Sequence, residues 1–339
     1  MEQSQLLALQ PIKFQKKSKK AFYYQSQCLN VRGPDKKLYT VTTSNAVPSK
    51  SKKIFQIINS NDNKLIRKMH VIRRSAISSL VICKESENIK LDREIQSKLP
   101  KYKIMNDNDV KIYNINRITK SLPKLGSLLY FDLEINKKKI TIEFNVRQIN
   151  FMNINGFLNT PQIPYIICNL KSNIDPEFLE SITGKAIFNK TNKIVGIIDS
   201  YNSEIQSFNI IPGYFIHKTL NNLILGVSNK IACLTIPYCL TSEGIKLMKS
   251  QNRIHKGDIL CKINHKKIDT EGNIYIPQLK YKVPIDTYIM LTFTCQEFIS
   301  LQIKKTSNST NHLIKKKLKS LYDILRVPPY NDKKIININ

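Results

Sequence analysis

The stretch that decides the fold is SITGKAIFNKTNKIVGIIDS, residues 181–200. Its apolar residues fall into two short runs, AIF and IVGII, which are separated by the polar residues 189–193. Asn, Lys and Thr are typical of turns, whereas short runs rich in Ile, Val and Phe are typical of strands. The stretch therefore predicts a strand, a turn and another strand.

The same pattern of short apolar runs separated by polar residues extends over residues 28–225. Short runs such as LYTVTTS, SLVICK and KKITIEFNV recur at close intervals, and many of them alternate apolar with polar residues. This period is that of a half-buried strand, and it favours a mainly β sandwich or barrel. At its end, GYFIHKTLNNLIL places Phe215, Leu220, Leu223 and Leu225 roughly on one side, which predicts a closing helix.

The chain has 339 residues, which suits two or three modules, and a net charge of +29. A positive surplus of this size favours contact with nucleic acid, another polyanion or an acidic partner surface. Ile, Asn and Lys are also the residues that an AT-rich genome imposes through its codons. Selection and codon drift therefore both remain open as sources of the charge.

The seven cysteines include no Cys-x-x-Cys pair, which favours free thiols in a reducing compartment. The five histidines do not pair with cysteines at ligand spacing, so we expect no metal and no cofactor. We find no signal peptide and no apolar segment of membrane-spanning length. The sequence predicts an intracellular, cytoplasmic protein that is not secreted, or one packaged inside a virion.

The opening stretch resembles trypsin-like serine proteases of the HtrA/Deg type. Gly184, Phe188, Asn189, Val195 and Gly196 fit the segment that carries the nucleophilic serine in that family and the hairpin that follows it. The resemblance implies a chymotrypsin-like double β-barrel over residues 28–225.

The resemblance also assigns the catalytic positions. Thr183 falls at the nucleophile, with Gly184 and Lys185 in the oxyanion turn, and TVTTSNAV and ISSLVICKES put Ala46 at the histidine and Ser79 at the aspartate. An alanine cannot accept a proton, and a threonine hydroxyl without a base is a poor nucleophile. The three replacements predict a degenerate triad and a pseudoprotease rather than an enzyme, with residual hydrolase activity left open.

Residues 226–305 resemble a protease-associated PDZ domain. Gly257 and Asp258 in HKGDILCKINHKKI match a turn that enters a strand. Such domains bind peptides by adding a strand to an open sheet edge. The resemblance implies a PDZ-like α+β domain, and the candidate peptide-binding residues are Leu225, Gly226 and Val227.

Three further segments carry local predictions. Residues 1–27 form a basic N-terminal arm, and TSEGIKLMKS, residues 241–250, predicts a short helix capped by Thr241 or Ser242. In the tail, residues 306–339, an amphipathic C-terminal helix is predicted by the spacing of Ile314, Leu318, Leu321 and Leu325.

Three functions remain open. The leading hypothesis is an inactive scaffold that binds a protein or peptide partner, alone or as an oligomer, with a virion of a large DNA virus as one setting. The second is an active serine/threonine-type endopeptidase with a displaced site, such as Thr183 with His70 as its base. The third is a basic nucleic-acid-binding protein that contacts phosphates without reading bases.

Overall fold

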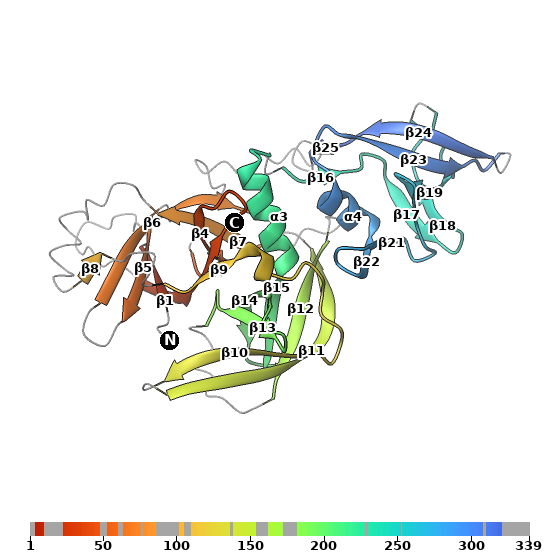
Figure 1. Ribbon diagram of the computed structural model, residues 1–339. Helices are drawn as coiled ribbons and strands as arrows, with labels where there is room; N and C mark the ends of the chain where they lie inside the picture. Colours follow the sequence, from red (N-terminus) through yellow and green to blue (C-terminus); the bar gives the residue numbers. More distant parts are fainter. Residues whose placement is uncertain are drawn as a thin grey trace, which may run out of the picture. The chain divides into compact units, whose positions relative to one another are not determined.

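The computed structural model describes residues 4–9, 23–47, 53–59, 64–75, 77–85, 102–104, 110–135, 138–153, 162–171, 182–227, 230–251, 253–307 and 310–320. The chain divides into two compact units (Figure 1). The first consists of residues 1–150 and 164–226, and the second of residues 151–163 and 227–339. Among the described residues, no helix has the length and apolar character needed to cross a membrane.

A nine-stranded sheet forms the first half of the first unit. Its order is β2 (Tyr23–Gln27), β1 (Ser4–Leu9), β5 (Lys53–Asn59), β6 (Lys64–Arg74), β7 (Leu80–Glu85), β4 (Leu38–Thr43), β3 (Leu29–Arg32) and β9 (Ile112–Asn114), while β8 (Tyr102–Ile104) pairs with β6. Residues 4–9 and 23–27, which the sequence assigns to a basic arm, therefore lie in strands. Leu29, Val31 and Val41 are fully buried in the core of this half.

The second half of the first unit is a closed barrel (Figure 1). Its strands follow the order β10 (Leu128–Ile135), β11 (Lys138–Asn153), β12 (Gln162–Leu170), β15 (Ser207–Pro212), β14 (Ile194–Asn202) and β13 (Ala186–Asn189). The rings of Phe131, Phe144 and Phe208 fill its core with centroids 5.6 to 6.3 Å apart. The strand, turn and strand predicted for residues 181–200 are confirmed as β13 and β14, which pair antiparallel.

Two helical segments border the barrel. A short 3-10 helix, η2 (Ile115–Arg117), precedes it, and α3 (Gly213–Ile224) follows it. The helix predicted over GYFIHKTLNNLIL is confirmed, and it buries Phe215 and Leu220.

The second unit has the predicted PDZ-like α+β form. Its six-stranded sheet has the order β17 (Tyr238–Thr241), β18 (Gly244–Leu247), β19 (Ile259–Ile263), β23 (Phe298–Lys304) and β24 (Asn311–Lys317), with β20 (Lys266–Lys267) paired to β19. The hairpin of β21 (Asn273–Ile276) and β22 (Tyr281–Pro284) leads into α4 (Ile285–Thr292). At the ends of the unit, β16 (Ala232–Cys233) pairs with β25 (Lys319–Ser320).

Part of this unit comes from an earlier segment of the chain. The Phe151 ring lies 6.0 Å from that of Tyr281, and the Thr287 hydroxyl donates to the Gln162 carbonyl at 2.6 Å. Phe151 and Gln162, which precede the last barrel strands in the sequence, thus contact residues more than 120 positions later in the chain.

The helix predicted over residues 241–250 is wrong. β17 and β18 form a hairpin there, and Gly244 adopts a φ of +120°, which favours glycine. Ile245 and Leu247 are buried on one face, so the period of this segment is that of a strand.

The predicted C-terminal helix is also wrong at its beginning. Residues 311–317 form the strand β24 instead. β24 pairs with β23 through seven pairs of residues, and this pairing outweighs the helical spacing of Ile314 and Leu318. Leu318 is fully buried, and its N–H donates to the Glu297 carbonyl at 2.8 Å. The rest of the predicted helix, residues 321–339, lies outside the described residues.

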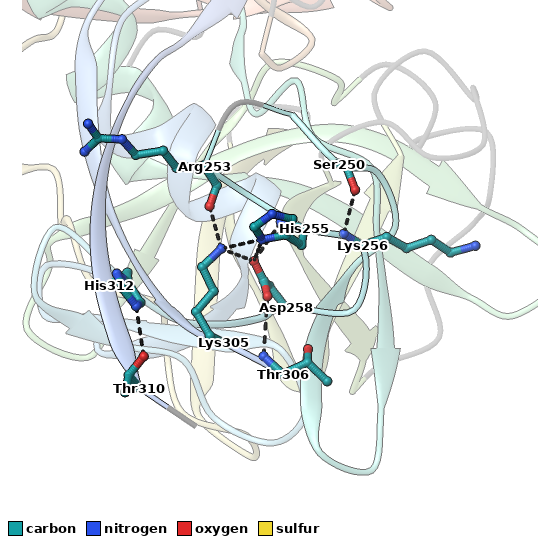
Figure 2. A network of polar contacts seen from close by, with 9 residues as sticks. All are labelled: Ser250, Arg253, His255, Lys256, Asp258, Lys305, Thr306, Thr310 and His312. Atoms are coloured by element: carbon teal, nitrogen blue, oxygen red, sulfur yellow. Dashed lines mark hydrogen bonds and ion pairs between the residues drawn. The ribbon is translucent and has the colours of Figure 1, made fainter. Parts of the chain in front are cut away.

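Figure 2 shows a polar network around the buried Asp258 and Lys305 that joins the turn before β19 to the end of β23. Lys305 Nζ lies 2.8 Å from Asp258 Oδ2, and it also donates to the Arg253 carbonyl and to His255 Nδ1. The backbone N–H groups of His255 and Thr306 donate to the same carboxylate. Burial raises the pKa of Asp258, but these hydrogen bonds outweigh it and hold the pKa below its usual value. The carboxylate therefore remains charged inside the unit.

Replacing Lys305 with methionine is expected to lower the free energy of unfolding of the second unit by about 3 kcal/mol or more, because Asp258 is left buried without its cation. Amide hydrogen exchange measured by mass spectrometry on the full chain should show faster exchange in β19 and β23. The adjacent residue Lys304 is exposed and provides the control, so Lys304→Met should leave amide exchange nearly unchanged. Equal exchange in both variants would show that the network adds nothing to stability.

Candidate functional site

Three side chains from the two halves of the first unit meet around Asp199. The Asn45 amide donates to the Asp199 carbonyl at 3.0 Å and to Oδ1 at 3.2 Å. Ser79 Oγ donates to Asp199 Oδ2 at 3.2 Å, and the Tyr165 hydroxyl lies 3.0 Å from Ser79 Oγ. We call Asn45, Ser79, Tyr165 and Asp199 the Asp199 cluster.

A β-bulge directs the Asp199 side chain. Along β14, Ile198 pairs with Ile210 and Ser200 with Asn209, so the register shifts at Asp199, between them. Bulges re-aim a side chain and recur near active sites. The bulge accounts for the position of a carboxylate, only 6% exposed, between the sheet and the barrel.

The Asn45 and Ser79 side chains are fixed by a small set of backbone bonds. The N–H groups of Ala46 and Val47 both donate to the Thr43 carbonyl at 3.1 Å, which forms a tight turn after β4. The Ser44 N–H donates to the Ser79 carbonyl at 2.6 Å and ties this turn to the residue before β7. Both polar side chains therefore approach Asp199 from the first sheet.

Burial sets the charge state of the cluster. It raises the pKa of Asp199 to about 6, although hydrogen bonds from Ser79 and Tyr165 oppose the shift. It also raises the pKa of Tyr165, so this hydroxyl remains a donor near neutral pH. A carboxylate with a pKa near the working pH is suited to general base catalysis.

The turn predicted to carry the nucleophile lies against the same strand. The Gly184 N–H donates to the Ile198 carbonyl at 2.8 Å, one residue before Asp199, and the Thr183 carbonyl accepts from the Gln27 N–H at 2.8 Å. Gly184 has a φ of +87°, in the left-handed region that glycine tolerates. Burial lowers the pKa of Lys185 to about 8, while the nearby Asp132 acts in the opposite direction.

The other predicted positions are less favourable for a triad centred on Thr183. Ala46 is 2% exposed and packs against Val47 and Met69 in the core. The His217 ring is bonded to the Ile118 carbonyl at 2.9 Å, and His70 lies in β6 opposite Lys84. Within the part of the chain that the structure describes, no hydrogen bond joins either ring to Thr183. A Thr183–His70 pair therefore gains no support.

Sequence reasoning missed Asp199, Asn45 and Tyr165. One signal was present, because Asp199 is the acidic residue that directly follows the buried run IVGII. A carboxylate that directly follows a buried apolar run within a strand needs polar partners, and such a residue is a candidate for function.

The proposed peptide-binding residues lie beyond α3. Leu225 follows the helix as its C-cap and is 74% exposed, and Gly226 has a φ of +65°. In the second unit, β17 ends the sheet, and its Tyr238 hydroxyl donates to the Asp286 carboxylate at the start of α4. This bond joins an edge strand of the sheet to the first turn of the helix.

Comparisons with solved structures support the fold. No family model and no curated protein matches the sequence. The chain is similar to the serine endoprotease from Yersinia pestis, with 13% identity, 94% of each chain covered and a TM-score of 0.53. It is also similar to the HtrA-type protease AlgW with a tripeptide, with 10% identity, coverage of 94% and 93% and a TM-score of 0.56. AlgW with a decapeptide gives 11% identity, 94% coverage of each chain and a TM-score of 0.53.

These findings overturn the prediction that the chain is a pseudoprotease without enzymatic activity. The solved structures that match it over nearly its whole length are proteases. The prediction rested mainly on the three replaced positions, and one of them, Ser79, donates a hydrogen bond to Asp199 of β14. The chain has the fold of an HtrA-type serine protease.

Proposed function

We propose that this chain is a serine-type endopeptidase in which Ser79 is the nucleophile and Asp199 the general base. The observation that carries the proposal is the hydrogen bond of 3.2 Å from Ser79 Oγ to Asp199 Oδ2. A nucleophile within hydrogen-bond reach of a base that is itself oriented by a third group is the arrangement that nucleophilic catalysis needs. Asn45 is that third group, because its amide holds Asp199 Oδ1.

The chemistry can be written from these atoms. The Ser79 O–H bond breaks as Oγ bonds to the scissile carbonyl carbon, and the proton passes to Asp199 Oδ2. The C–N bond then breaks, and the leaving nitrogen takes this proton. Water attacks the ester on Ser79 and gives its proton to Asp199, which returns it to Ser79 Oγ as the new acid leaves.

Tyr165 holds the Ser79–Asp199 pair in place, because its hydroxyl donates its one proton to the Asp199 carboxylate. Its hydroxyl lies 3.0 Å from Ser79 Oγ, and its raised pKa keeps the proton on the phenol. Ser79 is partly exposed whereas Asp199 is buried, so a substrate reaches the nucleophile first.

Extended polypeptide is the substrate class that this arrangement favours. The HtrA-type protease AlgW, similar in fold, binds a decapeptide and a tripeptide in its solved structures. In this chain, the edge strand β17 offers backbone groups for strand addition. Leu225, Gly226 and Val227 stay a separate prediction for contact with a peptide, made from the sequence alone.

The test uses the full chain with fluorescein-labelled casein and a fluorophosphonate probe, which bonds covalently to activated serine hydroxyls. We expect casein cleavage and a label on the peptide that contains Ser79. Both should be lost in Ser79→Ala and kept in Ser200→Ala, a control that removes another hydroxyl next to Asp199, bonded to Asn209. If the probe labels Thr183 instead of Ser79, then Thr183 is the nucleophile and the proposal is wrong. A natural chain that is neither labelled nor active would also overturn the proposal.

A further inference from the structure

The pairing of β23 with β24 shows which residues share the outward face of the second unit's sheet. Across β23 and β24, Phe298 lies opposite Lys317, Ser300 opposite Lys315, Gln302 opposite Leu313 and Lys304 opposite Asn311. The intervening residues Ile299, Leu301 and Ile303 are at most 1% exposed and form the inner face. Since strand residues alternate between faces, the first set points outward.

The outward face continues across β19 and β18. Lys262 lies opposite Gln302, and Lys246 lies opposite Ile259, which in turn lies opposite Lys304. None of the described outward positions on these strands is acidic. We call this surface the lysine face; its cationic members are Lys246, Lys262, Lys304, Lys315 and Lys317.

Two large apolar side chains stand among these lysines. Phe298 is 65% exposed and Leu313 is 64% exposed. Lys317 Nζ lies 5.9 Å from the centroid of the Phe298 ring. An uncovered aromatic ring flanked by cations is the arrangement on which proteins stack unpaired bases.

We propose that the lysine face binds single-stranded nucleic acid. The lysines contact phosphates, and Phe298 stacks on a base without reading its identity. A sheet face that presents an aromatic ring favours a single strand, because the bases of a duplex face one another and cannot reach the ring. The positive charge of the face, in a chain with a net charge of +29, complements this occupant.

The test is fluorescence anisotropy of the full chain with a labelled oligothymidylate across a salt series. We expect the affinity to fall with salt, with a log–log slope of about −0.7 for each phosphate that is neutralised. The double variant Lys315→Gln with Lys317→Gln should reduce that slope by about 1.4. Phe298→Ala should weaken binding about tenfold or more.

Matched controls separate this surface from general positive charge. Lys256 and Lys280 are exposed lysines of the same unit outside the lysine face, and Lys256→Gln with Lys280→Gln should retain nearly full affinity at equal net charge. All of the substituted side chains are exposed, and thermal melting confirms that each variant is folded. Equal losses in both pairs, binding that ignores salt, or equal binding of duplex DNA or anionic vesicles with no effect of Phe298→Ala would each overturn the proposal. None of these readouts depends on peptide hydrolysis.

Discussion

Replacing Asp199 with asparagine is expected to lower kcat/KM for peptide hydrolysis by about 10²–10⁴-fold. An amide cannot accept the Ser79 proton, whereas the hydrogen bonds that orient residue 199 come from Asn45 and persist in part. The measurement is the initial rate of casein cleavage at several substrate concentrations. Asp132→Asn is the control, because Asp132 is a carboxylate of the same barrel that accepts from the Thr141 hydroxyl.

The pH profile sharpens this expectation. In the natural chain, kcat/KM should rise with pH and level off above about 6, because Asp199 accepts a proton only when it is ionised. A profile that is flat through this range would assign the base to another group.

Stability should follow the opposite trend. The pKa of Asp199 is raised to about 6 in the folded chain, and an unfolded aspartate titrates at about 3.9. The folded state therefore binds the proton more tightly, and stability decreases as the pH rises between these values. Asp199→Asn should consequently be at least as stable as the natural chain near neutral pH, which separates a catalytic role from a structural one.

The second large effect is expected at Gly184. A Cβ at this position would lie 2.0 Å from the Gln27 carbonyl oxygen, and the φ of +87° is unfavourable for alanine. The obstacle is backbone, so it cannot move aside as a flexible side chain would. Gly184→Ala should lower the free energy of unfolding by more than about 4 kcal/mol.

Gly126 provides a matched comparison. Its φ is +75°, but no atom lies within 4 Å of the Cβ position. Gly126→Ala should therefore cost only about 1–2 kcal/mol, the strain of the left-handed backbone. Urea unfolding of both variants measures the difference, and similar losses would show that the contact with Gln27 relaxes easily.

The barrel hairpin could be predicted because its information is local. Two apolar runs around a polar turn define β13 and β14, and the amphipathic spacing that follows defines α3. The C-terminal segment could not be predicted in the same way. The spacing of Ile314 and Leu318 suits a helix, but the partner that decides is β23, and no local pattern reveals this pairing.

In the candidate site, too, local features could be predicted from the sequence and long-range contacts could not. Resemblance located Ser79, Thr183 and Gly184, because those positions lie in recognisable segments. The partner of Ser79 is 120 residues away, and the bulge that aims it toward the cluster is a property of pairing between β14 and β15. Spacing in the sequence cannot report a contact of this kind.

The interleaving of the two units has a consequence for synthesis. Phe151 and Gln162 emerge from the ribosome before the barrel is complete, yet Tyr281 and Thr287, which hold them, emerge later. β16 must also await β25, near the end of the described chain. Domains generally fold as units during translation, beginning with the N-terminal one. The nascent chain therefore passes through a stage in which Phe151 of β11, Gln162 of β12 and the strand β16 lack their later partners, and such incomplete stages expose a chain to chaperones and aggregation.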